Sequence, residues 1–401
     1  MTERRAGTIV LMAPNYRPES NAAAHRLTAL AEGLADSGWE VTMVTALPHY
    51  PQYRLYDGYD VPGPMITSEG NVRVIRLRPW IVSKASLPLR LISELWFGLK
   101  ALTHVLKARP DVVLASVPYM FLGPLGLLGA RLTGARFAWD VRDLTWLYPR
   151  AVGKRTFGLD TALERVMLFT ARRSDAMTTA TEGLLHYFER RPSRAAVVPN
   201  GVSDEWFERL AALRPPAGTP SVLYAGLLGY NHALATLIDA ASLMPDVRFA
   251  LAGDGPERPM LEEKTRDLRL ENVTFLGYLN EDQLVEAYST ATLLVSHVRR
   301  HPLYHWTQPA KLWEYMAAGR PVVHAGEGEA VRILRENDVG VTVPPEDPEA
   351  LASAIANLVS DPEGSRRLGE RARAFVDSER RRSRLVDWHV TMLEELISPK
   401  R

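Results

Sequence analysis

Short apolar runs alternate along this chain with longer stretches of helical periodicity. Near the start, runs at 8–12 and 41–45 enclose leucines and alanines at helical spacing that end at Gly38. A short apolar run indicates a buried strand, and a 3.6-residue period indicates a helix. The first 45 residues therefore predict a strand, helix, strand unit of a parallel sheet.

The alternation continues through the first half of the chain. Further strands are expected at 72–77, 112–116, 136–141 and 176–180, and helices at 86–108, 121–133 and 160–173. This order is typical of a doubly wound α/β domain.

A second domain begins after a turn signature at 199–202 and a proline-rich stretch at 214–220. The pattern restarts there, with strands expected at 221–225, 248–252, 273–276, 293–296, 321–325 and 340–343. Two domains also suit a length of 401 residues, because one hydrophobic core rarely grows that large. We expect an N-terminal domain at 1–203 and a C-terminal domain at 204–379, with a last helix at about 380–401 crossing back to the first.

Composition narrows the class of protein. The absence of cysteine excludes disulfides, thiolate metal sites and a cysteine nucleophile. The first apolar run is too short for a signal-peptide core, and the longest apolar stretch, 117–130, is too short to span a bilayer. A cytoplasmic protein is expected.

Charge is unevenly distributed. Residues 1–200 hold 25 Lys and Arg against 17 Asp and Glu, a balance of +8, and the remainder balances at −7. The basic half suits a membrane surface or a phosphate-bearing acceptor, although the asymmetry alone can also arise without function.

Helix 86–108 is the candidate for peripheral contact with an anionic membrane. Its spacing places Leu91, Ile92, Leu95, Leu99, Leu102 and Leu106 on one face, and Arg90, Lys100, His104 and Lys107 on the other, with Phe97 on the basic side. An aromatic side chain among cations is typical of an interfacial helix. The alternative is a core-packing helix with a solvated basic face.

Most candidate ligand-binding residues lie in the second half of the chain. Glycine-bearing turns follow strands at 225–229 and 251–256, where ligands bind in open parallel sheets. Thr307 is expected to cap the N-terminus of a helix. Lys311 lies near the start of that helix, where its ammonium could bind a diphosphate. Glu314, one turn on, could accept hydrogen bonds from a ribose diol. Each glycine turn alone is equally explained by a tight strand-to-helix connection.

Several motifs in order resemble the retaining glycosyltransferase family 4, of the GT-B architecture. They are PNGV at 199–202, YAG at 224–226, LAGDGP at 251–256, NVTFLG at 272–277 and KLWEYMAAGRPV at 311–322. Looser matches at 17–24, 38–51 and 140–143 resemble the branch that builds bacterial surface polysaccharides.

The resemblance implies two Rossmann-like domains facing a cleft and transfer of a sugar from a nucleotide diphosphate sugar to a glycan or lipid-linked acceptor. The implied donor-binding residues are Gly226, Gly229, Gly253, Gly255, Gly277, Tyr278, Thr307, Lys311 and Glu314. No metal, no further cofactor and no nucleic-acid partner are expected. Lys311 would stabilise the charge that develops on the leaving diphosphate.

Acceptor contacts are expected from loops after strands of the first domain. The candidates are Glu19, Asn21, Arg142 and Asp143, with Asp143 as any protein-supplied base. The alternative for Arg142 and Asp143 is a structural ion pair.

Two departures from the family pattern concern the donor site. The first of two glutamates usual in the family is replaced by Trp306, and a basic pair expected after Gly226 is absent. Lys311 is expected to compensate, with Arg299, Arg300 and His301 nearby. Alternatives are another enzyme on this scaffold, such as a nucleotide-sugar 2-epimerase or a glycan phosphorylase, or a non-catalytic binder.

Overall fold

The computed structural model describes residues 6–50, 53–82, 87–147, 158–214, 216 and 218–398. The chain divides into two compact units. Unit 1 comprises Met1–Pro199 and Arg382–Arg401, and unit 2 comprises Asn200–Arg381. The sequence placed these divisions at 203/204 and about 380.

Unit 1 is built on an eight-stranded sheet of order β3-β4-β2-β1-β5-β6-β7-β8. The strands are β1 (Gly7–Met12), β2 (Trp39–Ala46), β3 (Met65–Glu69), β4 (Val72–Leu77), β5 (Val112–Ser116), β6 (Arg136–Val141), β7 (Ala176–Thr179) and β8 (Arg194–Val197). All pair in parallel except β3, which runs antiparallel to β4 at the sheet edge. Strands β3 and β8 are additions to the predicted set.

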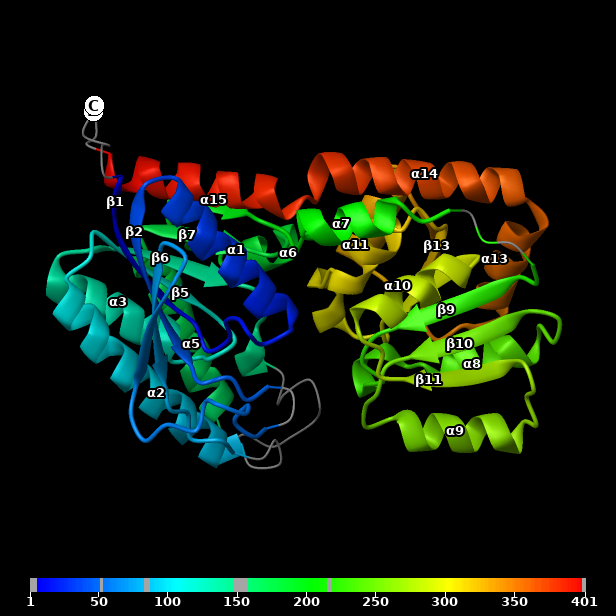
Figure 1. Ribbon diagram of the computed structural model, residues 1–401, viewed down its shortest axis with the longest axis horizontal. Helices are drawn as coiled ribbons and strands as arrows, with labels where there is room; N and C mark the ends of the chain where they lie inside the picture. The colour runs from blue at the N-terminus through cyan, green and yellow to red at the C-terminus, as the bar shows by residue number, and fades with distance from the viewer. Residues whose placement is uncertain are drawn as a thin grey trace. The chain divides into compact units, whose positions relative to one another are not determined.

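Helices cover both faces of this sheet. They are α1 (Ala22–Asp36), α2 (Leu87–Ala108), α3 (Leu122–Thr133), α5 (Leu159–Arg173), α6 (Glu182–Tyr187) and α15 (Arg382–Ile397), with a short 3₁₀ turn, η1 (Thr145–Leu147). On one face, α1 and α15 lie side by side over a core that includes Leu11 and Leu114 (Figure 1). On the other face, α3 packs against Met12 and Ala115, which point the opposite way because side chains alternate along a strand. The prediction that the last helix joins the first domain is confirmed.

The prediction that Phe97 of α2 is an interfacial aromatic side chain is wrong. Phe97 is buried and meets Tyr119 edge-to-face, whereas Ile92, Leu95 and Leu99 are exposed. The helix is apolar almost all round, so its periodicity does not define one buried face. Packing against α3 decides instead, because Gly98 fits directly against Leu125 of α3.

Unit 2 has a six-stranded parallel sheet of order β11-β10-β9-β12-β13-β14. The strands are β9 (Ser221–Ala225), β10 (Arg248–Ala252), β11 (Val273–Gly277), β12 (Leu293–His297), β13 (Val322–Ala325) and β14 (Val341–Val343). The helices are α7 (Asp204–Ala211), α8 (Ala235–Ser242), α9 (Arg258–Asp267), α10 (Glu281–Thr290), α11 (Ala310–Ala317), α12 (Glu329–Glu336), α13 (Pro348–Ser360) and α14 (Pro362–Glu379), with 3₁₀ turns η2 (Tyr230–His232) and η3 (Pro302–Trp306). The two core clusters, one on each side of the sheet, confirm a second Rossmann-like α/β domain.

Helix lengths and hydropathy also bear on membrane crossing. Among the residues that the structure describes, none of the helices is both long and apolar enough to cross a bilayer.

Candidate functional site

The donor-site candidates of unit 2 lie at the carboxyl ends of β9, β10 and β11, where three loops interlock through their backbones. Gly226 N–H donates to the Ala252 carbonyl at 2.9 Å, and Gly253 N–H donates to the Gly277 carbonyl at 2.7 Å. Gly253 and Gly255 adopt positive φ angles of 128° and 159°. A Cβ atom at Gly253 would lie 1.9 Å from the Gly226 carbonyl oxygen, so backbone packing already requires this glycine.

We expect Gly253→Ala to destabilise unit 2 by more than about 1 kcal/mol, because alanine adds both a clash and an unfavourable φ. Gly63→Ala is the matched control, since a Cβ there meets nothing within 4 Å. Urea-induced unfolding of both variants measures the difference. Equal stability of the two variants would show that the loops can separate at little cost.

Lys311 is the cation at the end of β9. It lies in the first turn of α11, and its half-buried side chain extends along Gly226. A Cβ atom at Gly226 would approach the Lys311 Nζ to 2.6 Å, so this glycine makes room for the ammonium group. Nζ donates a hydrogen bond to the Tyr224 hydroxyl and stands 4.1 Å from the centroid of that ring. The structure thus brings together Lys311 and Gly226, two residues that were predicted to bind the donor.

Tyr315 fixes α11 to the end of β9. Its hydroxyl accepts a hydrogen bond from Ala225 N–H at 2.8 Å and donates one to the Ala225 carbonyl at 2.7 Å. Tyr315 follows Lys311 by four residues, so the two side chains leave the same face of the helix. The position of the ammonium relative to Gly226 is therefore set by buried hydrogen bonds.

Electrostatics distinguish Lys311 from an ordinary surface lysine. Burial lowers its pKa to about 7, and Glu314, one turn later in α11, opposes that change. His232 of η2 stacks edge-on to Tyr224 and has a pKa lowered to about 3 by burial and by Lys311. Near neutral pH, Lys311 is thus the group of this cluster that changes charge.

The remaining donor-site candidates are distributed around this centre. Gly229 precedes η2, Gly277 turns at φ 71° after β11, and Tyr278 next to it is 78% exposed. Glu314 is half-buried. The predicted capping role of Thr307 is wrong, because α11 begins at Ala310 after Pro309 and the Thr307 hydroxyl donates to the Tyr304 carbonyl at 2.9 Å. The fixed φ of proline suits the position before a helix, which moves the start beyond the reach of Thr307.

The proposed reserve cations are engaged with carboxylates. Arg299 lies 3.8 Å from Glu257, and Arg300 lies 3.7 Å from Glu327. His301 meets the Tyr304 ring edge-to-face at a centroid distance of 5.8 Å.

Sequence reasoning missed two contributors to this region, Tyr224 and Gln308. The Gln308 amide donates to Glu329 at 2.8 Å, and its buried oxygen has no hydrogen-bond partner among the described residues. Groups of three or more His, Cys, Asp or Glu side chains that could hold a metal do not occur in the described residues.

The acceptor candidates of unit 1 also follow strands. Glu19 is buried and accepts hydrogen bonds from the backbone N–H groups of His49 and Tyr50 at 2.8 and 2.9 Å. Asn21 caps α1 by accepting from Ala24 N–H. Both residues therefore hold the loops in place, and acceptor contact by them stays a prediction.

Arg142 and Asp143 follow β6. The Arg142 guanidinium donates to the Val198 carbonyl and lies 3.6 Å from Asp140, a buried carboxylate of β6. Burial lowers the pKa of Arg142 to about 10, although Asp140 and Asp143 raise it. Asp143 itself is half-buried. Arg142 thus has a structural ion pair with Asp140, and its predicted roles with Asp143 stay predictions.

Family comparisons give the same division of the chain. Residues 21–201 match a glycosyl transferase 4-like domain, and residues 219–361 match the glycosyl transferases group 1 model. The chain is therefore built from two glycosyltransferase domains. Lys311, Glu314 and the glycine turns lie in the group 1 domain, and Glu19 lies just before the start of the 4-like match.

Individual proteins resemble this glycosyltransferase over nearly its whole length. The putative colanic acid biosynthesis glycosyl transferase WcaI of Escherichia coli is 26% identical over 398 residues, covering 92% of this chain and 97% of the relative. Sucrose-phosphate synthase from Thermosynechococcus elongatus superposes with a TM-score of 0.77 at 21% identity, covering 97% and 98% of the two chains. Anabaena HepE in complex with UDP gives a TM-score of 0.70 at 15% identity, covering 97% and 100%. The structural matches confirm the predicted fold of two Rossmann-like, GT-B-type domains.

Proposed function

We propose that this glycosyltransferase transfers a sugar, with retention of configuration, from a nucleotide diphosphate sugar to a glycan or lipid-linked acceptor. The relative named for colanic acid biosynthesis supports a role in surface polysaccharide synthesis. The UDP complex of the structural neighbour supports a nucleotide-linked donor.

The observation that carries the proposal is the placement of Lys311. Its ammonium stands against the Gly226 turn, at the carboxyl end of β9, which is where parallel α/β domains bind phosphates. Burial disfavours the charged form of this lysine, and the negative charge of a diphosphate there would offset that cost. In sugar transfer the bond from the anomeric carbon to the diphosphate oxygen breaks, so Lys311 would stabilise the leaving group.

A donor screen tests the proposal. Calorimetric titration of the purified chain with UDP-, GDP-, ADP- and dTDP-sugars should find one nucleotide that binds and whose affinity falls when Lys311 is changed to Met. Incubation of that donor with candidate acceptors should release the nucleoside diphosphate, and NMR of the product should show the donor's anomeric configuration. Full activity in excess EDTA is expected for a metal-independent reaction.

The same screen separates the alternative enzymes. A 2-epimerase would convert the nucleotide-sugar without any acceptor, and a phosphorylase would require inorganic phosphate. Formation of either product would contradict the transferase proposal, and binding without turnover of any donor and acceptor pair would favour a non-catalytic binder.

Donor binding is expected to weaken as the pH rises above about 7. Burial lowers the pKa of Lys311 to about 7 in the free protein, and a bound diphosphate would raise it by favouring the charged form. Binding then takes up a proton above pH 7, and each further pH unit lowers affinity by up to about tenfold until the pKa of the complex is reached. His232 stays neutral through this range.

Titrations in buffers of different ionisation enthalpy measure that proton uptake. The Lys311→Arg variant is the control, because arginine keeps its charge and should bind with little pH dependence. A wild-type affinity that is constant from pH 6 to pH 8.5 would contradict the assigned role of the lysine.

A further inference from the structure

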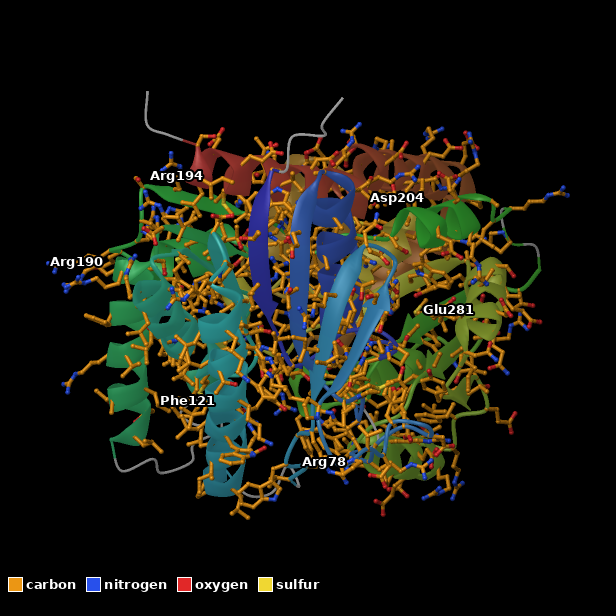
Figure 2. The ribbon with its side chains drawn as sticks, turned by 60° about the vertical axis from the view of Figure 1, so that its left-hand side comes forward. Arg78, Phe121, Arg190, Arg194, Asp204 and Glu281 are labelled. Carbon is orange, nitrogen blue, oxygen red and sulfur yellow. The ribbon has the colours of Figure 1, made fainter. Side chains whose placement is uncertain are left out.

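Three neighbouring helices of unit 1 expose an unusual amount of apolar surface. Of 23 large hydrophobic side chains that are exposed among the described residues, 12 lie on α2, α3 and α5. They include Ile92, Trp96, Leu99, Leu132, Val166 and Phe169, with exposed fractions between 43% and 63%. Helix α3 contacts both α2 and α5, so the three helices are neighbours, and their exposed side is here named the α2–α3–α5 face. Figure 2 shows green α5 beside the cyan helices, with Phe121 labelled at the start of α3.

These exposed apolar side chains do not fill the contacts between the helices. The contact between α2 and α3 is made close by glycines, since a Cβ atom at Gly129 would lie 2.9 Å from Leu102 and Val105. Gly126 allows the same close approach of α3 to Phe137 of the sheet. The larger hydrophobic side chains therefore project outward. Soluble monomers rarely expose a continuous apolar surface of this kind unless it binds something.

Cations accompany the apolar residues. The three helices carry seven lysines and arginines: Arg90, Lys100, Lys107, Arg131, Arg165, Arg172 and Arg173. Their three acidic residues are Glu94 and Asp160, both buried, and Glu164, which is half-buried and accepts a hydrogen bond from Tyr187. Arg90 pairs with Glu94 and Arg131 with Asp175, so the excess positive charge of this face comes mainly from Lys100, Lys107, Arg165, Arg172 and Arg173.

Two of these cations lie over exposed aromatic rings. Lys100 Nζ is 4.8 Å from the centroid of a Trp96 ring, and Arg173 Cζ is 5.4 Å from that of Phe169. Long basic side chains beside aromatic rings are suited to a boundary where hydrocarbon meets charged headgroups, because the stem and ring are apolar and the tip is polar.

We propose that the α2–α3–α5 face binds the surface of an anionic phospholipid bilayer, with its apolar side chains inserted at the headgroup boundary. Charge complementarity favours lipid over a second copy of the chain, because a twofold contact through this face would bring two sets of the same cations together. The face extends over three helices, and on α2 it includes Ile92 and Trp96. Membrane binding through this face is independent of which donor or acceptor the enzyme uses.

Vesicle flotation of the full chain tests the proposal. Vesicles of phosphatidylcholine with phosphatidylglycerol should bind the protein at least about tenfold more strongly than phosphatidylcholine alone, since each cation near an anionic surface adds attraction. The apolar triple variant Ile92→Ser, Trp96→Ser, Phe169→Ser should lose at least about tenfold in partitioning. The matched control Leu243→Ser, Met260→Ser, Leu268→Ser changes side chains of unit 2 with similar exposure and should bind like the wild type.

A charge variant gives an independent second measurement. Lys100→Glu with Lys107→Glu should weaken binding to anionic vesicles and reduce its sensitivity to salt. Circular dichroism confirms that each variant is folded. The proposal is overturned if wild-type protein does not float with anionic vesicles, if both triple variants bind equally, or if sedimentation shows a dimer that the Ile92, Trp96, Phe169 variant abolishes while vesicle binding is unchanged.

Discussion

Changing Lys311 to alanine is expected to lower the turnover number by about 100- to 1000-fold, the loss typical when one donor to a developing negative charge is removed. The ammonium lies against Gly226, bonded to Tyr224, in the position from which it would meet the donor diphosphate. Initial rates of nucleoside diphosphate release, measured at saturating donor, give the effect on turnover. The donor dissociation constant, from calorimetry, should rise as well.

Lys264→Ala is the matched control for this variant. Lys264 lies in α9 of the same unit, where its ammonium pairs with Asp239 at 2.7 Å on the surface, and its loss should leave turnover unchanged. Thermal unfolding should show that Lys311→Ala is folded, because replacing the half-buried lysine side chain with a methyl group leaves the hydrogen bonds between Tyr315 and Ala225 in place. If turnover of Lys311→Ala is within threefold of the wild-type value, Lys311 does not stabilise the transition state.

The sequence predicted most of the fold because buried parallel strands and amphipathic helices have strong periodic patterns. It missed β3, whose sequence MITSE has only two apolar residues, one of them Ile66 at 54% exposure. An edge strand is held by pairing with one neighbour and needs little apolar character. Phe97 of α2 is buried, against the prediction, for the opposite reason, since apolar residues surround this helix and packing against α3 selects which of them are buried.

The candidate site was predictable in its residue types and less so in its contacts. Lys311 was found because it opens a helix after proline and precedes Glu314 by three residues. Its partner Tyr224 lies 87 residues earlier, and only the packing of α11 on β9 brings the two together. Gly253 was interpreted as room for a ligand, whereas the structure shows that the loop after β9 occupies that space. Contacts between backbone segments that are far apart in the sequence cannot be predicted from the local sequence.

Asp140 of β6 is not among the predicted site residues, yet it is a buried carboxylate with several polar partners. One oxygen lies 2.7 Å from Arg26 of α1 and accepts a hydrogen bond from Ser116 of β5 at 2.7 Å. The other accepts from Thr178 of β7 at 2.9 Å. Burial by itself would raise the pKa of Asp140, but Arg26 and Arg142 hold it far below the ordinary value. The carboxylate thus links a helix to three adjacent strands.

Asp140→Asn is expected to destabilise unit 1 by about 3–5 kcal/mol, because asparagine keeps the shape but removes the negative charge that lies between the largely buried guanidinium groups of Arg26 and Arg142. The free energy of unfolding, from urea titrations at pH 7, measures this loss. Asp60→Asn is the control, since Asp60 pairs with Arg78 at 2.8 Å while 77% exposed, and its loss should change stability by at most about 1 kcal/mol.

The pH dependence of the free energy of unfolding is a second test of the role of Asp140. A carboxylate whose folded pKa is depressed stabilises the protein above its unfolded pKa, and that contribution is lost as the pH falls toward the folded value. Wild-type stability should therefore fall on acidification below about pH 4, the unfolded pKa of aspartate, and the decline should be shallower in Asp140→Asn. If Asp140→Asn and Asp60→Asn have equal stability at pH 7, the guanidinium groups must be solvated without Asp140, and the carboxylate does not hold α1 to the sheet.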